Sequence, residues 1–501
     1  LTKVNDRTRT PQATTQMGYY DTPSWRAIYG ARTFAMSAEK LKFARFNHKT
    51  DMKIHIGPLC RPRLTLVLVL AALPAAFAQV VDTVKTADNP LPPVVRSFIG
   101  DYVQSADGAI SLRNATKRQQ FNGSQKSTFD RDIASPKSAG FHPDGSRLYV
   151  NSLEGCATVV YDARTMRKLK VISHRFEPAA DTRWATPSGF YPWTHYADGA
   201  RRPFSGKPVE MAFSHRGRYL WVPYYRRSFD INAQDPSAVA VIDTRTDSIV
   251  RMFETGPLPK MVATSNGGDL LAITHWGDNT VGLIDISGER PDTWRHLQPI
   301  VIGKKLQLDF PLDRSVDRDS KSGLLLRGTI FTPGDRHMLI GCMGGSIAVV
   351  DVARRRHTGF INDIYNVRHL ALRGNRVYAS QNVAGKIWSI AADSLTSAID
   401  RAAEAGRRAI SANGWRGCQV GKGARTLEVS PDGRYTFVAC NFDSRVDVVD
   451  NETMKVVTSI RCDSYPVGLA LSRRGGTLAV TSQGRRGQGG NALNLFNIHR
   501  K

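Results

Sequence analysis

The chain has 501 residues, 41% of them apolar and 23% charged, a globular composition that excludes a largely disordered protein. Its 69 Lys and Arg residues outnumber its 44 Asp and Glu residues, which gives a formal net charge of +25. This excess suits anionic partners and says nothing about the fold. The length predicts about two to four domains, unless one repeat architecture takes up most of the chain.

The N-terminal region has the order of a targeting segment. Residues 1–51 show no sustained apolar period, and a basic stretch then opens at Met52. An apolar run over 64–73 and a small-x-small sequence at 76–78 follow, as in a secretory signal peptide over 52–78. The run is too short to span a bilayer. We therefore predict that 1–51 is an untranslated or disordered extension. The mature protein is expected to be periplasmic or secreted, with no membrane span after cleavage.

The remaining chain is predicted to be all-β. Seven segments share one pattern, in which an apolar strand, a Gly-centred polar turn, a second strand and a third strand ending near Asp follow one another. They are 138–165, 209–246, 261–287, 329–353, 369–391, 426–453 and 467–498. One such sheet cannot bury both faces alone, and radial stacking of seven hides them. We expect a seven-bladed β-propeller of four-stranded blades over 136–501, with a short helical insert near 393–412.

The seventh repeat stops after three strands, so its fourth strand must come from elsewhere. The N-terminal segment 79–135 contains an alternating stretch at 108–113 that is a candidate for closing the ring.

The pattern F-x-P-D-G-x-x-L-Y-V…V-x-V-I-D resembles YVTN-repeat β-propellers. The resemblance spans about 136–498 and implies an exported bacterial envelope protein. Propellers of related fold include lactonases, the propeller domain of haem-containing nitrite reductase, amine-dehydrogenase heavy chains and binding proteins. The resemblance therefore leaves the function open.

Long insertions point to one face of the predicted ring. The segments 174–206, 288–323 and 396–422 are expected between blades, and 224–236 between a second and a third strand. All four are predicted at the face where the inner strands begin, and loops on a rigid scaffold often carry binding residues.

The residue eight positions before the turn glycine begins an inner strand at the mouth of the central channel. In the fourth repeat Asp335 is taken as the turn position, and the fifth repeat needs a one-residue gap. Five of the seven positions are basic, and they are Lys137, Lys260, Arg327, Arg368 and Arg425. Such a ring focuses positive potential on a narrow opening. Second strands end at the same face and add hydrogen-bonding and stacking groups, namely Asn151, Tyr224, His275, Trp276, Gln381 and Asn441. These eleven residues are the predicted ligand-binding set.

The sequence lacks HExxH, GxSxG, Walker, CxxC and CxxCH motifs, and neither a metal nor a cofactor is predicted. We expect a monomeric binding protein whose partner is an anionic small molecule, an envelope polymer or a protein. Nucleic acid would bind without specificity. The alternative is a lactonase-like hydrolase that uses Glu210, His275 and Arg327, and an electron-transfer propeller is a third option. Cys418 and Cys440 are candidates for a disulfide.

Overall fold

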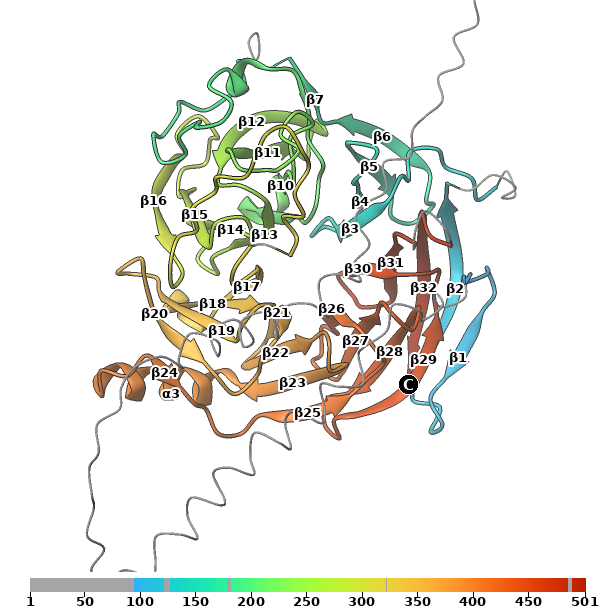
Figure 1. Cartoon of the computed structure of the whole chain (residues 1–501). Coiled ribbons are helices and arrows are strands. Elements are labelled where there is room, and N and C mark those ends of the chain that lie inside the picture. The colour runs from blue at the N-terminus through green and yellow to red at the C-terminus, as the bar shows by residue number, and fades with distance from the viewer. Residues whose placement is uncertain (1–93, 121–126, 178–181, 321, 485–488) are drawn as a thin grey trace, which may run out of the picture. The chain divides into compact units, whose positions relative to one another are not determined.

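The computed structural model describes residues 94–120, 127–177, 182–320, 322–484 and 489–501. Seven small sheets surround a common axis, with one strand of each nearest the centre (Figure 1). The predicted all-β, seven-bladed β-propeller is therefore confirmed. The predicted extension 1–51 and signal peptide 52–78 lie outside the described residues.

Each blade pairs its strands in chain order from the inner to the outer edge, except that the outer strands of blade 7 come from the N-terminal segment. Blade 1 is β3 (Pro136–Phe141), β4 (Arg147–Ser152), β5 (Ala157–Asp162) and β6 (Lys168–Ser173). Blade 2 is β9 (Ala212–Ser214), β10 (Tyr219–Pro223), β11 (Ser237–Asp243) and β12 (Ser248–Thr255). Blade 3 is β13 (Pro259–Thr264), β14 (Leu270–His275), β15 (Thr280–Asp285) and β16 (Arg295–Val301). Blade 4 is β17 (Leu326–Phe331), β18 (His337–Cys342), β19 (Ile347–Asp351) and β20 (Arg356–Ile361).

The remaining blades follow the same order. Blade 5 is β21 (Val367–Arg373), β22 (Arg376–Gln381), β23 (Lys386–Ala391) and β25 (Arg416–Gln419). Blade 6 is β26 (Ala424–Val429), β27 (Tyr435–Cys440), β28 (Arg445–Asp450) and β29 (Lys455–Arg461). Blade 7 is β30 (Pro466–Leu471), β31 (Thr477–Ser482), β32 (Ala492–Arg500) and β2 (Ile110–Gln119), which carries β1 (Tyr102–Gln104) as a fifth strand. A small ribbon of β7 (Arg175–Phe176) and β8 (Phe204–Ser205) lies between blades 1 and 2 in the chain.

Blade 7 joins the two ends of the described chain. Strand β2, which contains most of the stretch proposed as the closing strand, pairs antiparallel with β32 from Ile110↔Arg500 to Gln119↔Ala492. The pairing gives blade 7 its fourth strand from the N-terminal segment, so the first and last parts of the described chain meet in one blade and close the ring.

The insertion predicted over 396–422 does not lie at the face where the inner strands begin, which we call the mouth face. Helix α3 (Ala392–Glu404), the one α-helix of the described residues, follows the third strand of blade 5. It therefore leaves at the opposite face, where Asp393 accepts from Asn375 Nδ2 and Asp400 accepts from Arg336. Strand β24 (Ala409–Ile410) then pairs in parallel with β20 of blade 4. The prediction failed because it placed the fourth strand of blade 5 before the insertion instead of after it.

The insertion predicted over 288–323 is interrupted by β16, so only residues 302–325 connect blades 3 and 4. This segment and 224–236 lie at the mouth face as predicted, because each follows a strand that runs toward the mouth face and leads into a strand that runs away from it. In the described ranges no helix is long and apolar enough to cross a membrane.

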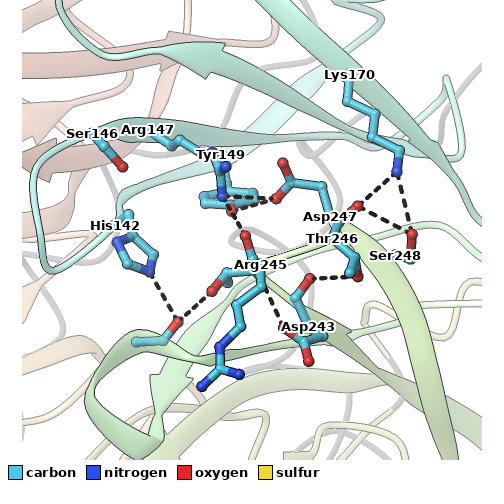
Figure 2. Close-up of polar contacts among 12 residues, drawn as sticks. His142, Ser146, Arg147, Tyr149, Lys170, Asp243, Arg245, Thr246, Asp247 and Ser248 are labelled. Carbon is cyan, nitrogen blue, oxygen red and sulfur yellow. Dashed lines mark hydrogen bonds and ion pairs between the residues drawn. The ribbon is translucent and has the colours of Figure 1, made fainter.

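Neighbouring blades are joined by apolar clusters and by polar contacts at their edges. Figure 2 shows the contacts between blades 1 and 2, where Tyr149 Oη donates to the buried Asp247 Oδ1 at 2.6 Å. Lys170 Nζ donates to Thr246 O at 2.8 Å, and Arg147 donates to Thr244 O. Side chains from both blades share one core cluster, which includes Tyr149.

The predicted disulfide is absent. Cys418 on β25 and Cys440 on β27 are both buried free thiols. Cys440 Sγ contacts Val438 O and Asp447 Oδ2, at 3.6 and 3.5 Å. The two cysteines lie in different blades within one apolar cluster, where they act as small core side chains.

Candidate functional site at the channel mouth

Six of the seven inner strands begin with a backbone irregularity next to the residue that faces the channel mouth, which we call the mouth residue. In six blades the residue two positions earlier has a positive φ, and the pairing register shifts beside the mouth position. The positive-φ residues are Ser135, Leu258, Leu325, Asn366, Gly423 and Tyr465, with φ between 51° and 76°. A β-bulge bends the strand and re-aims a side chain, and a left-handed non-glycine residue stores strain. Five of the six mouth residues placed in this way are the predicted cations.

The five cations are buried and act on one another. Their exposed fractions lie between 2% and 6% for Lys137, Lys260, Arg327, Arg368 and Arg425. Burial lowers the pKa of Arg327, and the charges of Arg368 and Arg425 act in the same direction, so that its pKa is about 9. Burial also lowers the pKa of Lys137 well below its usual range. The charges of Arg425, Arg327 and Arg368 act in the same direction, whereas the charge of Glu210 acts to raise this pKa. The predicted ring of positive charge therefore exists as a close cluster.

Glu210 supplies one compensating charge. Its Oε1 lies 3.1 Å from Lys137 Nζ. Burial acts to raise the pKa of Glu210, but Lys137 and Arg327 outweigh it and hold the pKa below its ordinary value. Glu210 is therefore an ionised partner of the ring, and its lowered pKa does not favour a general base at neutral pH.

Asp319 supplies the second compensating charge, and it comes from the 302–325 insertion. Its Oδ1 lies 3.1 Å from Lys260 Nζ, and its Oδ2 accepts from Tyr225 Oη at 2.6 Å. Burial acts to raise the pKa of Asp319, yet Lys260 and Arg226 bring it down to about 2. The Lys260 ammonium also lies 3.6 Å from the centre of the Tyr225 ring and 4.7 Å from that of Trp276.

The insertion that carries Asp319 is held in place by the second predicted insertion. Asn232 donates to Arg314 O at 3.0 Å and accepts from Val316 N at 2.7 Å. Gln234 exchanges two hydrogen bonds with the backbone of Phe310. Side chains of 224–236 thus fix the backbone that presents Asp319 to the mouth.

Arg327 is not bonded to a carboxylate of the described chain. Its guanidinium lies 4.8 Å from the centre of the Trp276 ring, and its buried Nε has no hydrogen-bond partner within the described chain. The Trp276 Nε1 is likewise buried without a partner there. Arg327 takes part in neither ion pair of the mouth, because Glu210 bonds Lys137 and Asp319 bonds Lys260.

The mouth therefore has two unlike halves. Blades 1 to 3 provide the two lysines, each bonded to a carboxylate. Blades 4, 5 and 6 provide three consecutive arginines, of which Arg368 contacts Met343 Sδ and Arg425 donates to Val467 O. An anion with several oxygens matches the arginine half, since guanidinium groups bind carboxylate or phosphate with two parallel hydrogen bonds.

Several residues of the predicted binding set serve the structure of the blades. His275 is fully buried, accepts from Gly256 N and bonds Thr280 Oγ1, and burial lowers its pKa to about 3. Tyr224 contacts His174, and Gln381 accepts from Trp388 Nε1.

Asn151 bonds Ser138 and the backbone of Glu210, and so supports the mouth without presenting a free group. Asn441 is buried at the end of β27, and its Oδ1 has no hydrogen-bond partner among the described residues. Of the six second-strand residues, Trp276 contacts two of the cations directly, Lys260 and Arg327.

Sequence reasoning missed Asp319 and Tyr225, because no local pattern in 302–325 or 224–236 indicates which side chain reaches the axis. It also left His369 outside the binding set. Burial and the charges of Arg368, Lys137 and Arg327 lower the pKa of His369 to about 4, although the charge of Glu210 acts to raise it. Within the described residues, no group of three or more His, Cys, Asp or Glu side chains is arranged to hold a metal.

Comparisons with known proteins add a likeness of fold. No protein-family model matches the chain, and a search of curated proteins finds no significant match. The chain is similar to hydrazine synthase of Kuenenia stuttgartiensis, at 13% identity and a TM-score of 0.48, over 76% of this chain and 98% of that one. It is also similar to the Cps50 (Swd1) β-propeller domain of Myceliophteria thermophila, at 12% identity and a TM-score of 0.49, over 73% and 97%. No function passes from either protein to this chain.

Proposed function

We propose that this propeller is a binding protein that holds a small, multiply charged anion, such as a polycarboxylate or a phosphate ester, against the arginine half of its mouth. The observation that carries the proposal is the buried Arg327, whose Nε has no partner in the described chain and which lies among four other cations. A buried cation is costly unless it is paired and hydrogen-bonded. A bound anion would supply both.

An exported, envelope location belongs to the same proposal, and it is supported by the predicted signal peptide. The hydrolase hypothesis gains nothing from the geometry, because His275 bonds Gly256 and Thr280 and neither Glu210 nor Arg327. Glu210 is engaged by Lys137.

The test measures thermal unfolding against a panel of polycarboxylates and phosphate esters at two salt concentrations. A ligand at 100 times its Kd stabilises the protein by about 2.7 kcal/mol. We expect one class of anion to stabilise the protein even at high salt, because buried charges are poorly screened. Stabilisation by every polyanion that vanishes in salt would contradict a built site.

The informative variant is Arg327→Met, with the exposed Arg473→Met as its matched control. Removing a buried cation that has an unpartnered Nε should leave the free protein at least as stable as the wild type. The same change should abolish the stabilisation by anions, whereas R473M should keep it. If R327M binds the anions as the wild type does, the proposed site is wrong. A loss of stability without ligand, with unchanged anion binding, would make Arg327 purely structural.

A further inference from the structure

A second cavity lies away from the mouth, between the N-terminal segment and the edge of blade 6. Its volume is about 710 Å³, within the range of pockets that bind small molecules. One wall is formed by residues 94–98, and the other by residues of β28 and β29 and the turn before β28. Ser464 N donates to Val95 O and Val95 N donates to Ser464 Oγ, and these bonds hold the N-terminal segment against the connection between blades 6 and 7.

The wall formed by the N-terminal segment exposes apolar side chains. Val94 and Phe98 are 48% and 63% exposed and line the cavity, and Ile99 and Tyr102 follow at 55% each. Four of the thirteen large apolar side chains exposed in the described residues thus lie within nine consecutive positions. Contiguous exposed apolar surface of this kind marks a binding site more often than scattered single residues do.

The opposite wall is cationic. Arg445 and Arg461 are directly opposed across β28 and β29, and Arg96 lines the same cavity. Like charges at opposed positions of a sheet destabilise the pairing. Arg445 is bonded through two nitrogens to the buried Asp447, at 2.7 and 3.2 Å, whereas Arg461 is exposed and makes no hydrogen bond or ion pair within the described residues.

Asp443 is the one acidic residue that lines the cavity, and its Oδ2 accepts from Lys422 N at 2.8 Å. The cavity therefore combines exposed apolar side chains with Arg461, which has no bonded carboxylate among the described residues.

From these features we propose that the cavity binds a small amphiphilic anion, an apolar chain or ring that ends in a carboxylate or sulfonate. The apolar part lies against Val94 and Phe98, and the anionic end bonds Arg461. The proposal is independent of the anion proposed for the channel mouth, because the two sites share no residue.

The test uses anilinonaphthalene sulfonate, a fluorescent apolar anion, titrated into the full chain and displaced by decanoate. The titration is done in an R327A background, so that the mouth does not contribute. We expect saturable binding with one site, displacement by decanoate, and no displacement by decyltrimethylammonium, which has the same chain and the opposite charge.

The variants Arg461→Ala and Phe98→Ala should each raise the Kd of the probe about tenfold. The matched controls are R473A, which removes an exposed arginine elsewhere, and V383A, which shortens an exposed apolar side chain of blade 5. Equal weakening by the controls, displacement by the cationic amphiphile, or no saturable binding would overturn the proposal. Retention of probe binding in both R461A and F98A would do the same.

Discussion

At the channel mouth, individual charges on different blades determine one another's ionisation. Lys137 and Lys260 tolerate burial because Glu210 and Asp319 lie 3.1 Å from them. Arg327 lacks such a carboxylate, and its pKa of about 9 reflects burial and the neighbouring arginines. The mouth thus keeps a cation without a bonded carboxylate at the position of the proposed ligand.

Asp319→Asn should destabilise the free protein by about 3 kcal/mol at neutral pH, because the substitution leaves Lys260 buried without its carboxylate. The pKa of Asp319 falls from an ordinary 3.8 to about 2 on folding. A carboxylate with a depressed pKa stabilises the fold above its unfolded pKa, and this contribution is lost as the pH falls through the folded value.

The stability difference between wild type and D319N should therefore be complete above about pH 5 and shrink between pH 4 and pH 2. Urea unfolding at a series of pH values measures it. The exposed Asp313→Asn in the same insertion is the control and should show no difference. A difference that persists undiminished at pH 2 would contradict the assigned ion pair.

Counting back from the turns located the five cations of the mouth, with Asp335 taken as the turn position in the fourth repeat and a one-residue gap in the fifth. The same counting could not reveal the backbone that aims them. Ser135, Leu258 and Leu325 adopt positive φ without a glycine or asparagine to signal it. Nor could it find Asp319, whose position depends on hydrogen bonds from Asn232, in the preceding blade.

Among the elements, β2 depends on a buried ion pair as well as on its backbone pairing with β32. Lys117 Nζ lies 2.7 Å from Asp463 Oδ1 in the connection between blades 6 and 7, and Asn494 Nδ2 bonds the other carboxylate oxygen. Burial raises the pKa of Asp463 above its ordinary value, against the opposing effect of Lys117. The closing strand is therefore fixed to two blades at once.

Lys117→Met should lower the free energy of unfolding by about 3 to 5 kcal/mol, because it leaves Asp463 buried without a cation. The double variant K117M/D463L should recover part of this loss, since neither charge remains. Urea midpoints measure both, with the exposed Lys455→Met as the control. An unchanged midpoint in K117M would show that the ion pair does not hold the strand.

The elements differ in how much the sequence says about them. Alternating strands around Gly-centred polar turns identified every blade, and the stretch at 108–113 indicated the closing strand. The insertion of blade 5 was misplaced because β25 has only four residues, Arg416–Gln419, and its Gly417 and Cys418 give no apolar alternation. Such a strand is recognisable only from its pairing with β23.

For the whole molecule, stability rests on packing between blades and not on covalent cross-links. The five described cysteines are buried thiols, and burial raises the pKa of Cys342 to about 12. A buried neutral thiol reacts slowly, because the thiolate is the nucleophile. Iodoacetamide should therefore leave these five cysteines unmodified in the native protein and alkylate them in urea, as peptide mapping would show.

Dithiothreitol should leave the Tm unchanged. Native alkylation of Cys418 or Cys440, or a fall in Tm on reduction, would contradict the buried free thiols.

The closure of blade 7 also has a consequence for biosynthesis. Strand β2 pairs with β32, yet about 370 residues separate them, which at about 5–20 residues per second takes the ribosome roughly 20 to 75 s. During this time β2 has no β32 to pair with, and the ring of blades already made is still open. The ring thus becomes a closed unit only once β32 has left the ribosome, so a protein that shields exposed strands would be needed most while blades 1 to 6 are already made.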